Sequence, residues 1–253
     1  MAIVRVQGNA RGTSGSGSTS VSVTLGATPT AGNVLVLTIG IYGQVNLPSV
    51  TGISQTGVTW YYQIKSSRST IDDEIWFGVV GSGASKSLTV SWANFGYSVA
   101  DVCEYSGILT SGYLDKTATN SGQSKYSDTG TTATTTQADE LWIGATASGT
   151  TQTTPTNGFT LLDGVNNVAI SIAYLEKIVS ATGTADSGTT MTGSISWAGC
   201  IATFKASAAP PPAGWTKLQY LTEPPTVGAF NKLKYAAEPP VSGAWNKLLY
   251  VGE

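Results

Sequence analysis

The chain has 253 residues and a net charge of −2, with 11% charged and 41% hydrophobic residues. This composition excludes a disordered polyelectrolyte, and no apolar run reaches the roughly 18 residues that a membrane-spanning helix needs. The few lysine and arginine residues are scattered, so we expect neither nucleic-acid binding nor membrane insertion.

The N-terminal stretch MAIVRVQGNARGTSGSGSTS lacks the apolar segment of a secretory signal. The chain is nevertheless rich in Ser, Thr and Gly, as extracellular proteins often are. Synthesis in the cytoplasm with release by lysis, prior processing of the chain, or secretion without a signal would each reconcile these observations.

Short strands are predicted along most of the chain. Residues 20–25 (SVSVTL) alternate apolar and polar side chains, which is typical of a strand with one buried face. Residues 33–43 (NVLVLTIGIYG) are apolar on both faces, so we expect a central strand there. Runs rich in aromatic and β-branched residues predict further strands at 58–65, 74–80, 87–93, 97–107, 140–147, 159–164, 167–179, 192–198 and 199–205. Together they predict an all-β fold, an antiparallel β-sandwich of jelly-roll-like or immunoglobulin-like type, over residues 1–206.

The composition changes after the predicted sandwich. Residues 207–214 (SAAPPPAG) predict a short, stiff linker, because consecutive prolines favour an extended backbone. Residues 215–253 contain three copies of a short phrase, each beginning (W/F)-x-K-L-x-Y and the first two continuing into E-P-P. We interpret each copy as a strand followed by a turn.

Three such strands bury too little surface to fold alone. We therefore expect the repeats to dock on another protein or on sister copies of this chain; a duplicated segment without a partner is the alternative. The docking side chains would be Trp215, Leu218, Tyr220, Phe230, Leu233, Tyr235, Trp245, Leu248 and Tyr250.

Little in the sequence points to catalysis. The absence of histidine removes the commonest general base and the commonest zinc ligand. The acidic cluster Asp72-Asp73-Glu74 could form a weak calcium site, or it could serve a glycosidase together with Asp101, Glu104 or Asp163. We favour a third interpretation, a solvated turn before a strand that begins at Glu74. The sequence thus predicts no enzyme activity, no metal and no cofactor.

Aromatic residues are a stronger signal. In the run TWYY, neighbouring side chains point to opposite faces of a strand, so at least one ring should reach solvent. A flat apolar ring with a polar edge can stack on a sugar, which makes Trp60, Tyr61 and Tyr62 candidate glycan contacts. The alternative is that these rings fill the space between two sheets.

Cys103 and Cys200 are the two cysteines, and both lie in apolar, strand-like runs. Their spacing fits neither a disulfide framework nor a metal site. We expect two buried thiols, and a single disulfide between neighbouring strands is the alternative.

Several segments resemble a β-sandwich module of bacteriophage virion proteins and some bacterial surface proteins. They are EIWFGVVGSGASKSLTVSWA, VCEYSGI, LDKTATNSGQS, TTQADELWIGATA and GCIATFKA, within residues 35–206. The linker and repeats are similar to terminal segments of phage structural and fibre-like proteins.

This resemblance implies a non-enzymatic virion accessory protein, a capsid decoration or fibre component, located on the virion surface. The repeats would attach to other virion proteins or to sister copies, and trimers are common among such parts. An extracellular or cell-surface adhesin that binds carbohydrate is the alternative function.

Overall fold

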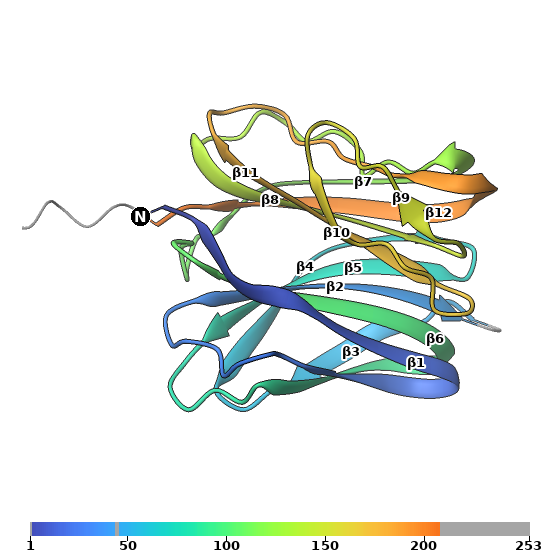
Figure 1. The fold of residues 1–253 in the computed structure, drawn as a ribbon, viewed down its shortest axis with the longest axis horizontal. Helices are drawn as coiled ribbons and strands as arrows, with labels where there is room; N and C mark the ends of the chain where they lie inside the picture. Colours follow the sequence, from blue (N-terminus) through green and yellow to red (C-terminus); the bar gives the residue numbers. More distant parts are fainter. Residues whose placement is uncertain (1, 44–45, 208–253) are drawn as a thin grey trace, which may run out of the picture. The chain divides into compact units, whose positions relative to one another are not determined.

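The computed structural model describes residues 2–43 and 46–207. Two antiparallel sheets face each other, and no described residue lies in a helix (Figure 1). The all-β prediction is therefore confirmed at the level of a two-sheet sandwich. The linker from residue 208 onward and all predicted docking residues of the repeats lie outside the described residues.

The first sheet comes from the N-terminal half of the chain. It contains β1 (Val4–Thr24), β2 (Val34–Gly43), β3 (Ser49–Ser54), β4 (Val58–Arg68), β5 (Ile71–Val80) and β6 (Ser87–Ser106). Their order across the sheet is β1-β6-β2-β5-β4, with β3 paired to β6. The apolar strand β2 is central, as expected, because Val34 and Val36 pack toward the second sheet whereas Leu35 and Leu37 belong to a separate core.

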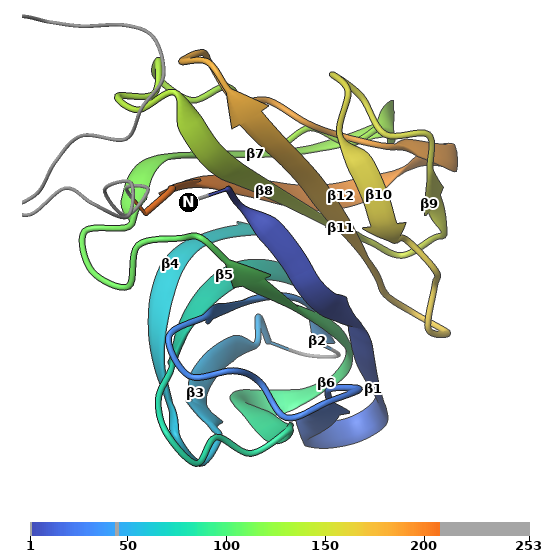
Figure 2. The same ribbon diagram turned by 60° about the vertical axis from the view of Figure 1, so that its left-hand side comes forward.

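The first sheet covers that second core by bending over itself (Figure 2). The end of β1, the start of β6, and β3 bring Val23, Val90 and Trp92 against Leu37 on β2. Small residues and irregular pairing between Ser14 and Ser20 let β1 follow the bend. The first part of β1 was not predicted as a strand, because beyond Val4 and Val6 its Gly/Ser-rich sequence has no apolar alternation.

The second sheet comes from the rest of the described chain. It contains β7 (Leu114–Tyr126), β8 (Asp139–Ser148), β9 (Gln152–Thr153), β10 (Thr160–Asp163), β11 (Ser171–Ser180) and β12 (Thr190–Lys205), in the order β10-β11-β8-β12-β7 with β9 paired to β12. Leu141, Tyr174 and Phe204 point toward the first sheet and complete the core between the sheets. The buried Tyr174 hydroxyl donates to the Val36 carbonyl oxygen at 3.3 Å, which joins the two sheets directly.

The outer face of the second sheet is covered by chain that forms no strand. The Thr-rich segment before β8 runs beside the segment before β12, with backbone hydrogen bonds such as Thr129 N to Ser187 O and Thr132 N to Ala185 O. Beneath them, Trp142 and Phe159 form a small apolar cluster. This covering explains why the polar stretch TGTTATTTQ contains several buried threonines.

The two sheets share one strand order. Replacing β1 to β6 by β7 to β12 converts the order of the first sheet into that of the second, including the side strand that pairs with the last strand. The registers of the central strands agree as well. Leu37 on β2 is paired with Trp76 on β5 and Val102 on β6, and Trp142 on β8 is paired with Lys177 on β11 and Thr203 on β12. The sequence separation between the two paired residues is the same in both sheets. The sandwich thus consists of two six-stranded units with the same central pairing.

This arrangement differs from both finer topologies expected from the sequence. In immunoglobulin-like and jelly-roll sandwiches the chain passes repeatedly between the sheets. Here it passes once, between β6 and β7. Sequence patterns identify strands well, but they contain little information on which strands share a sheet.

The interpretation of Asp72-Asp73-Glu74 as a solvated turn is wrong. β5 begins at Ile71, so the three acidic residues lie within the strand, and each is at most 1% exposed. Glu74 is accommodated because it accepts hydrogen bonds from Val50 N at 2.9 Å and Trp76 Nε1 at 2.7 Å. The first donor lies on β3, which pairs with β6, and the second lies on the same face of β5 as Glu74.

Both cysteines are buried free thiols, and the alternative of a disulfide is not realised. Cys103 faces the start of β1 at Gly8, and the Cys200 Sγ lies 3.6 Å from Asp73 Oδ2. Burial raises the pKa of the Cys103 thiol to about 12 and also raises that of Cys200. Neither thiol is therefore a reactive thiolate at neutral pH.

The two ends of the described sandwich lie together. Ser207 N donates to Gly107 O at 2.8 Å. Gly107 has a φ of 79°, and a side chain there would collide with the carbonyl oxygen of Ala2. These contacts lie near the first residue of β2. At the last residue of β2, Gly43 N donates to Thr70 O in the turn between β4 and β5.

Candidate functional site

The predicted glycan contacts lie on β4, an edge strand of the first sheet. Tyr61 and Tyr62 are 45% and 52% exposed, whereas Trp60 is half-buried. A register shift between Tyr62 and Ile64 interrupts the regular alternation of side chains at this point. The expectation that at least one ring of TWYY reaches solvent is therefore confirmed.

Trp60 and Tyr62 belong to one surface together with Trp76, which we call the aromatic face. Tyr62 pairs across the strands with Trp76, and their rings meet edge to face with centroids 5.5 Å apart. Trp60 pairs with Gly78, whose missing side chain lets the indole lie against the backbone of β5. The result is a row of three rings along the outer side of β4 and β5.

Polar groups fix the orientation of two of these rings. Trp60 Nε1 donates to Gln55 Oε1 at 3.2 Å, and Trp76 Nε1 donates to Glu74 Oε2 at 2.7 Å. Because both indole nitrogens are bonded, the rings are held with their edges fixed.

Tyr61 does not belong to the aromatic face. Its ring lies 6.3 Å from that of Tyr113, which in turn stacks on Phe77 at 3.7 Å. Tyr61 therefore extends the core between the sheets toward solvent. The structure separates it from the other two predicted glycan contacts.

The second unit has no equivalent of this exposed surface. When β2 and β8 are aligned on their first residues, Lys177 takes the place of Trp76. The Lys177 Nζ lies 5.6 Å from the ring centroids of both Trp142 and Phe159, and both rings are only 5% exposed. The same strand pairing therefore forms in the second unit without exposed rings, although Trp60 and Trp76 also pack against the second core of the first sheet.

A buried acidic group lies under the aromatic face. The Asp72 carboxyl is fully buried, and the Lys65 Nζ is 3.8 Å from its Oδ1. Burial and the neighbouring Glu74 raise the pKa of Asp72 to about 8, while Lys65 acts in the opposite direction. This shift in pKa favours the protonated, neutral form of Asp72 at neutral pH, which reduces charge repulsion with the adjacent Glu74.

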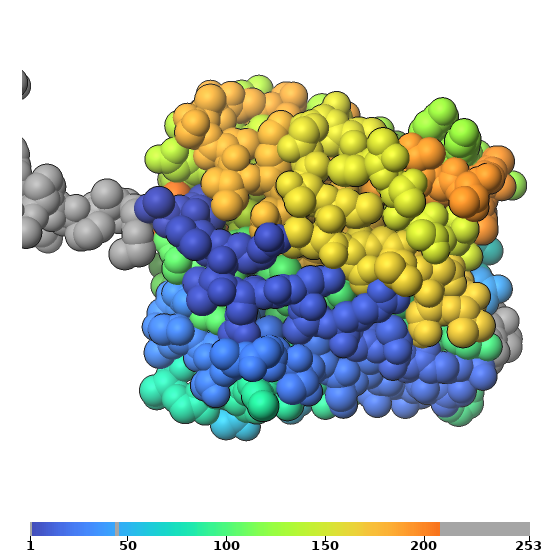
Figure 3. All heavy atoms as spheres, in the orientation of Figure 1, coloured from blue at the N-terminus to red at the C-terminus, as the bar shows by residue number. Residues whose placement is uncertain are grey.

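The structure does not assemble the carboxylates that a glycosidase would need. Asp101 and Asp163 lie between the sheets, where Arg11 Nη1 binds both oxygens of Asp163 at 2.7 and 2.9 Å. Figure 3 shows the blue spheres of the N-terminal segment adjoining the yellow segment of the second sheet. Glu104 accepts hydrogen bonds from Gln7, Thr30 and Asn33 elsewhere on the first sheet. None of these groups faces Asp72 or Glu74 across a cleft in the described chain.

Other classes of site are equally without support in the described part of the chain. Residues 2–43 and 46–207 contain no group of three or more acidic or cysteine side chains arranged to hold a metal ion. They also contain no helix able to cross a membrane. Comparison of the whole sequence with protein-family models, with curated proteins and with solved structures finds no match in any of the three. The resemblance to phage virion proteins therefore stays a prediction.

The sequence identified Trp60 and Tyr62 but did not pair them with Trp76. The missing information was the register of β4 against β5. One signal was present in the sequence: in EIW, Glu74 and Trp76 are two residues apart and so share a face of a strand. The same pattern recurs in ELW, where Trp142 Nε1 donates to Glu140 Oε2 at 3.0 Å.

Proposed function

We propose that this chain is a non-enzymatic display protein of a bacteriophage particle, a capsid decoration or fibre component. The observation that carries the proposal is the position of Ser207. It lies beside Gly107 at one end of the sandwich, so the linker begins at that end. The repeats would bind other virion proteins or sister copies, including a trimer, and would place the sandwich on the virion surface.

Removal of residues 214–253 tests this attachment. We expect the shortened protein to keep the cooperative unfolding of the sandwich but to be absent from purified particles. Tyr62→Ala in the full-length chain is the matched control, because it changes an exposed ring on the sandwich and should leave incorporation unchanged. Normal incorporation of the shortened protein would contradict the proposal.

A second candidate function, carbohydrate binding, is favoured by the aromatic face. Tyr62 is 52% exposed beside the half-buried rings of Trp60 and Trp76. Fixed, flat and partly apolar rings match the apolar faces of sugars, and they lose little conformational freedom on binding. This function is compatible with display on a particle.

For a glycan that binds this face, we expect Tyr62→Ala to weaken the affinity about tenfold, because exposed aromatic anchors commonly carry that share of binding energy. Binding is measured on a glycan array and then by titration calorimetry. Tyr126→Ala is the control, since Tyr126 is 61% exposed but lies on β7 of the other sheet. Equal affinity of the two variants would exclude the aromatic face as the binding surface.

A further inference from the structure

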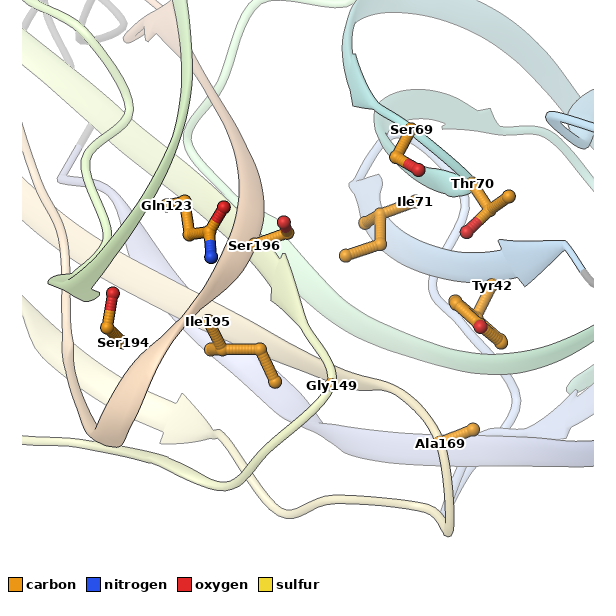
Figure 4. A pocket seen from close by; sticks show the side chains of 10 residues that line it. All are labelled: Tyr42, Ser69, Thr70, Ile71, Gln123, Gly149, Ala169, Ser194, Ile195 and Ser196. Atoms are coloured by element: carbon orange, nitrogen blue, oxygen red, sulfur yellow. The ribbon is translucent and has the colours of Figure 1, made fainter.

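A groove of about 480 Å³ opens at the end of the sandwich opposite Ser207 (Figure 4). One wall comes from the second sheet, through Gln123 on β7 and residues 194–196 on β12. The other wall comes from the first sheet, through Tyr42 at the end of β2 and the turn that joins β4 and β5. The complete lining is Tyr42, Ser69, Thr70, Ile71, Gln123, Gly149, Ala169, Ser194, Ile195 and Ser196.

The chain builds this groove with irregular backbone at several positions. Ser69 has a φ of 55°, which turns the chain sharply between β4 and β5. The pairing of β12 with β7 shifts between Thr190 and Ile195, which leaves Ser194 outside the regular ladder. Gly149 lies next to Ile195, and a side chain at this glycine would approach the Ile195 Cδ1 to 3.1 Å.

The lining of the groove combines polar side chains with apolar surface and contains no charged side chain. Among the described residues, no protein group forms a hydrogen bond with the side-chain hydroxyls of Tyr42, Ser69, Thr70, Ser194 and Ser196 or with the amide of Gln123. Three of these side chains, those of Ser69, Gln123 and Ser194, are exposed to solvent. Hydroxyl and amide groups can each donate and accept hydrogen bonds. Ile71, which is 5% exposed, and the half-buried Ile195 add apolar surface between them.

We propose that this groove is a binding site for a neutral saccharide unit. A sugar presents closely spaced hydroxyls around an apolar ring face, and the groove offers unpaired donors and acceptors around isoleucine and tyrosine surfaces. Its volume lies within the range of small-ligand sites, about 300 to 1,000 Å³. An acidic ligand would find no cation in the lining, and a purely apolar ligand would remove water from polar side chains without replacing its hydrogen bonds.

This site is separate from the aromatic face. The groove is formed by strand ends and turns of both sheets, whereas the aromatic face lies along β4 and β5 of the first sheet. The proposal therefore depends neither on attachment through the repeats nor on sugar stacking at Tyr62. In a displayed protein, the groove would be at the end away from the start of the linker.

The test uses the full-length chain and a panel of neutral oligosaccharides that contain hexoses and N-acetylhexosamines, first on an array and then by calorimetry. We expect Gln123→Ala and Tyr42→Phe each to weaken binding of a positive oligosaccharide about five- to tenfold, because each removes hydrogen-bonding groups from the groove. Ser111→Ala, at the opposite end of the sandwich, is the matched control and should bind as the unchanged chain does.

The outcomes separate the two surfaces. Loss of binding in Gln123→Ala with normal binding in Tyr62→Ala supports the groove. Loss only in Tyr62→Ala assigns the sugar to the aromatic face and overturns the groove proposal, as does a panel with no binding to any neutral oligosaccharide. Gln123 is exposed on an edge strand, so the Gln123→Ala variant should keep the thermal unfolding midpoint of the unchanged chain. This variant therefore tests the groove even if Tyr42→Phe is unstable.

Discussion

Replacing Arg11 with methionine is expected to lower the free energy of unfolding by about 3 kcal/mol, because it leaves the charge of the buried Asp163 without its partner. Arg11 reaches from β1 to the second sheet, where it binds both oxygens of Asp163 and donates to Val165 O at 2.8 Å. The Asp163 side chain is only 5% exposed, and Asp101 lies beside it. Urea unfolding of the variant measures the effect.

Arg5→Met provides a matched control for this prediction. Arg5 also extends from β1 to the second sheet, but its contact with Glu176 is 3.5 Å long and its side chain is 36% exposed. Exposed pairs of this kind contribute less than about 1 kcal/mol. In addition, Arg11→Met combined with Asp163→Asn should be more stable than Arg11→Met alone, because the uncompensated charge is gone. Equal stability of the Arg5 and Arg11 variants would refute the argument.

The second large effect is on pH dependence: the sandwich should unfold at a higher temperature at pH 5 than at pH 8. Burial and Glu74 raise the pKa of Asp72 to about 8, and burial, partly opposed by a hydrogen bond from Trp142, raises that of Glu140 to about 7. Between pH values of about 4 and these folded values, the folded state holds protons that the unfolded state releases. Each such group lowers stability by up to about 1.4 kcal/mol per pH unit as the pH rises through this window.

In strong acid, by contrast, we expect the stability of the sandwich to fall as the pH is lowered. Although partial burial acts to raise it, hydrogen bonds from Thr136 hold the pKa of Asp115 well below its usual range. This contribution is lost below a pH of about 4, so stability should be greatest near pH 4 to 5.

Asp72→Asn isolates one contributor; burial also raises the pKa of Asp73 and Asp101. The amide is neutral at every pH, so the variant should lose part of the decrease in unfolding temperature between pH 5 and pH 8. Calorimetric scans of both proteins across this range make the comparison. An unfolding temperature that rises from pH 5 to pH 8 in the unchanged chain would show that these carboxyls are ionised in the folded state.

The strands could largely be predicted from the sequence because most carry a strong local signal. The apolar run of β2 indicated a central strand, and β2 is buried on both faces. The first part of β1 carried no such signal, because glycine and serine form a strand there only through pairing with β6. The buried carboxyl of Glu74 was equally inaccessible to prediction, since its donors include a backbone amide on another strand.

The candidate sites show the same division. Exposure of a ring in TWYY followed from alternation along one strand, which is local. The contact between Tyr62 and Trp76 depends on the register of two strands, and the groove depends on segments far apart in the chain. Such features are set by tertiary packing and leave no pattern within one stretch of sequence.

The shared strand order of the two sheets has a consequence for the origin of this protein. Fusion of two copies of an ancestral six-stranded subunit would give this arrangement, with one chain crossing between them. Hydrogen bonds from Ser66 to the Asn120 carbonyl and from Asn167 to the Ser14 carbonyl connect the units in reciprocal directions, as contacts across a dimer axis do. The core between the sheets then corresponds to a former subunit interface. After such a fusion the two outer faces would be free to differ, as they do here: one has buried rings under a lysine, and the other has a partly exposed row of aromatic side chains.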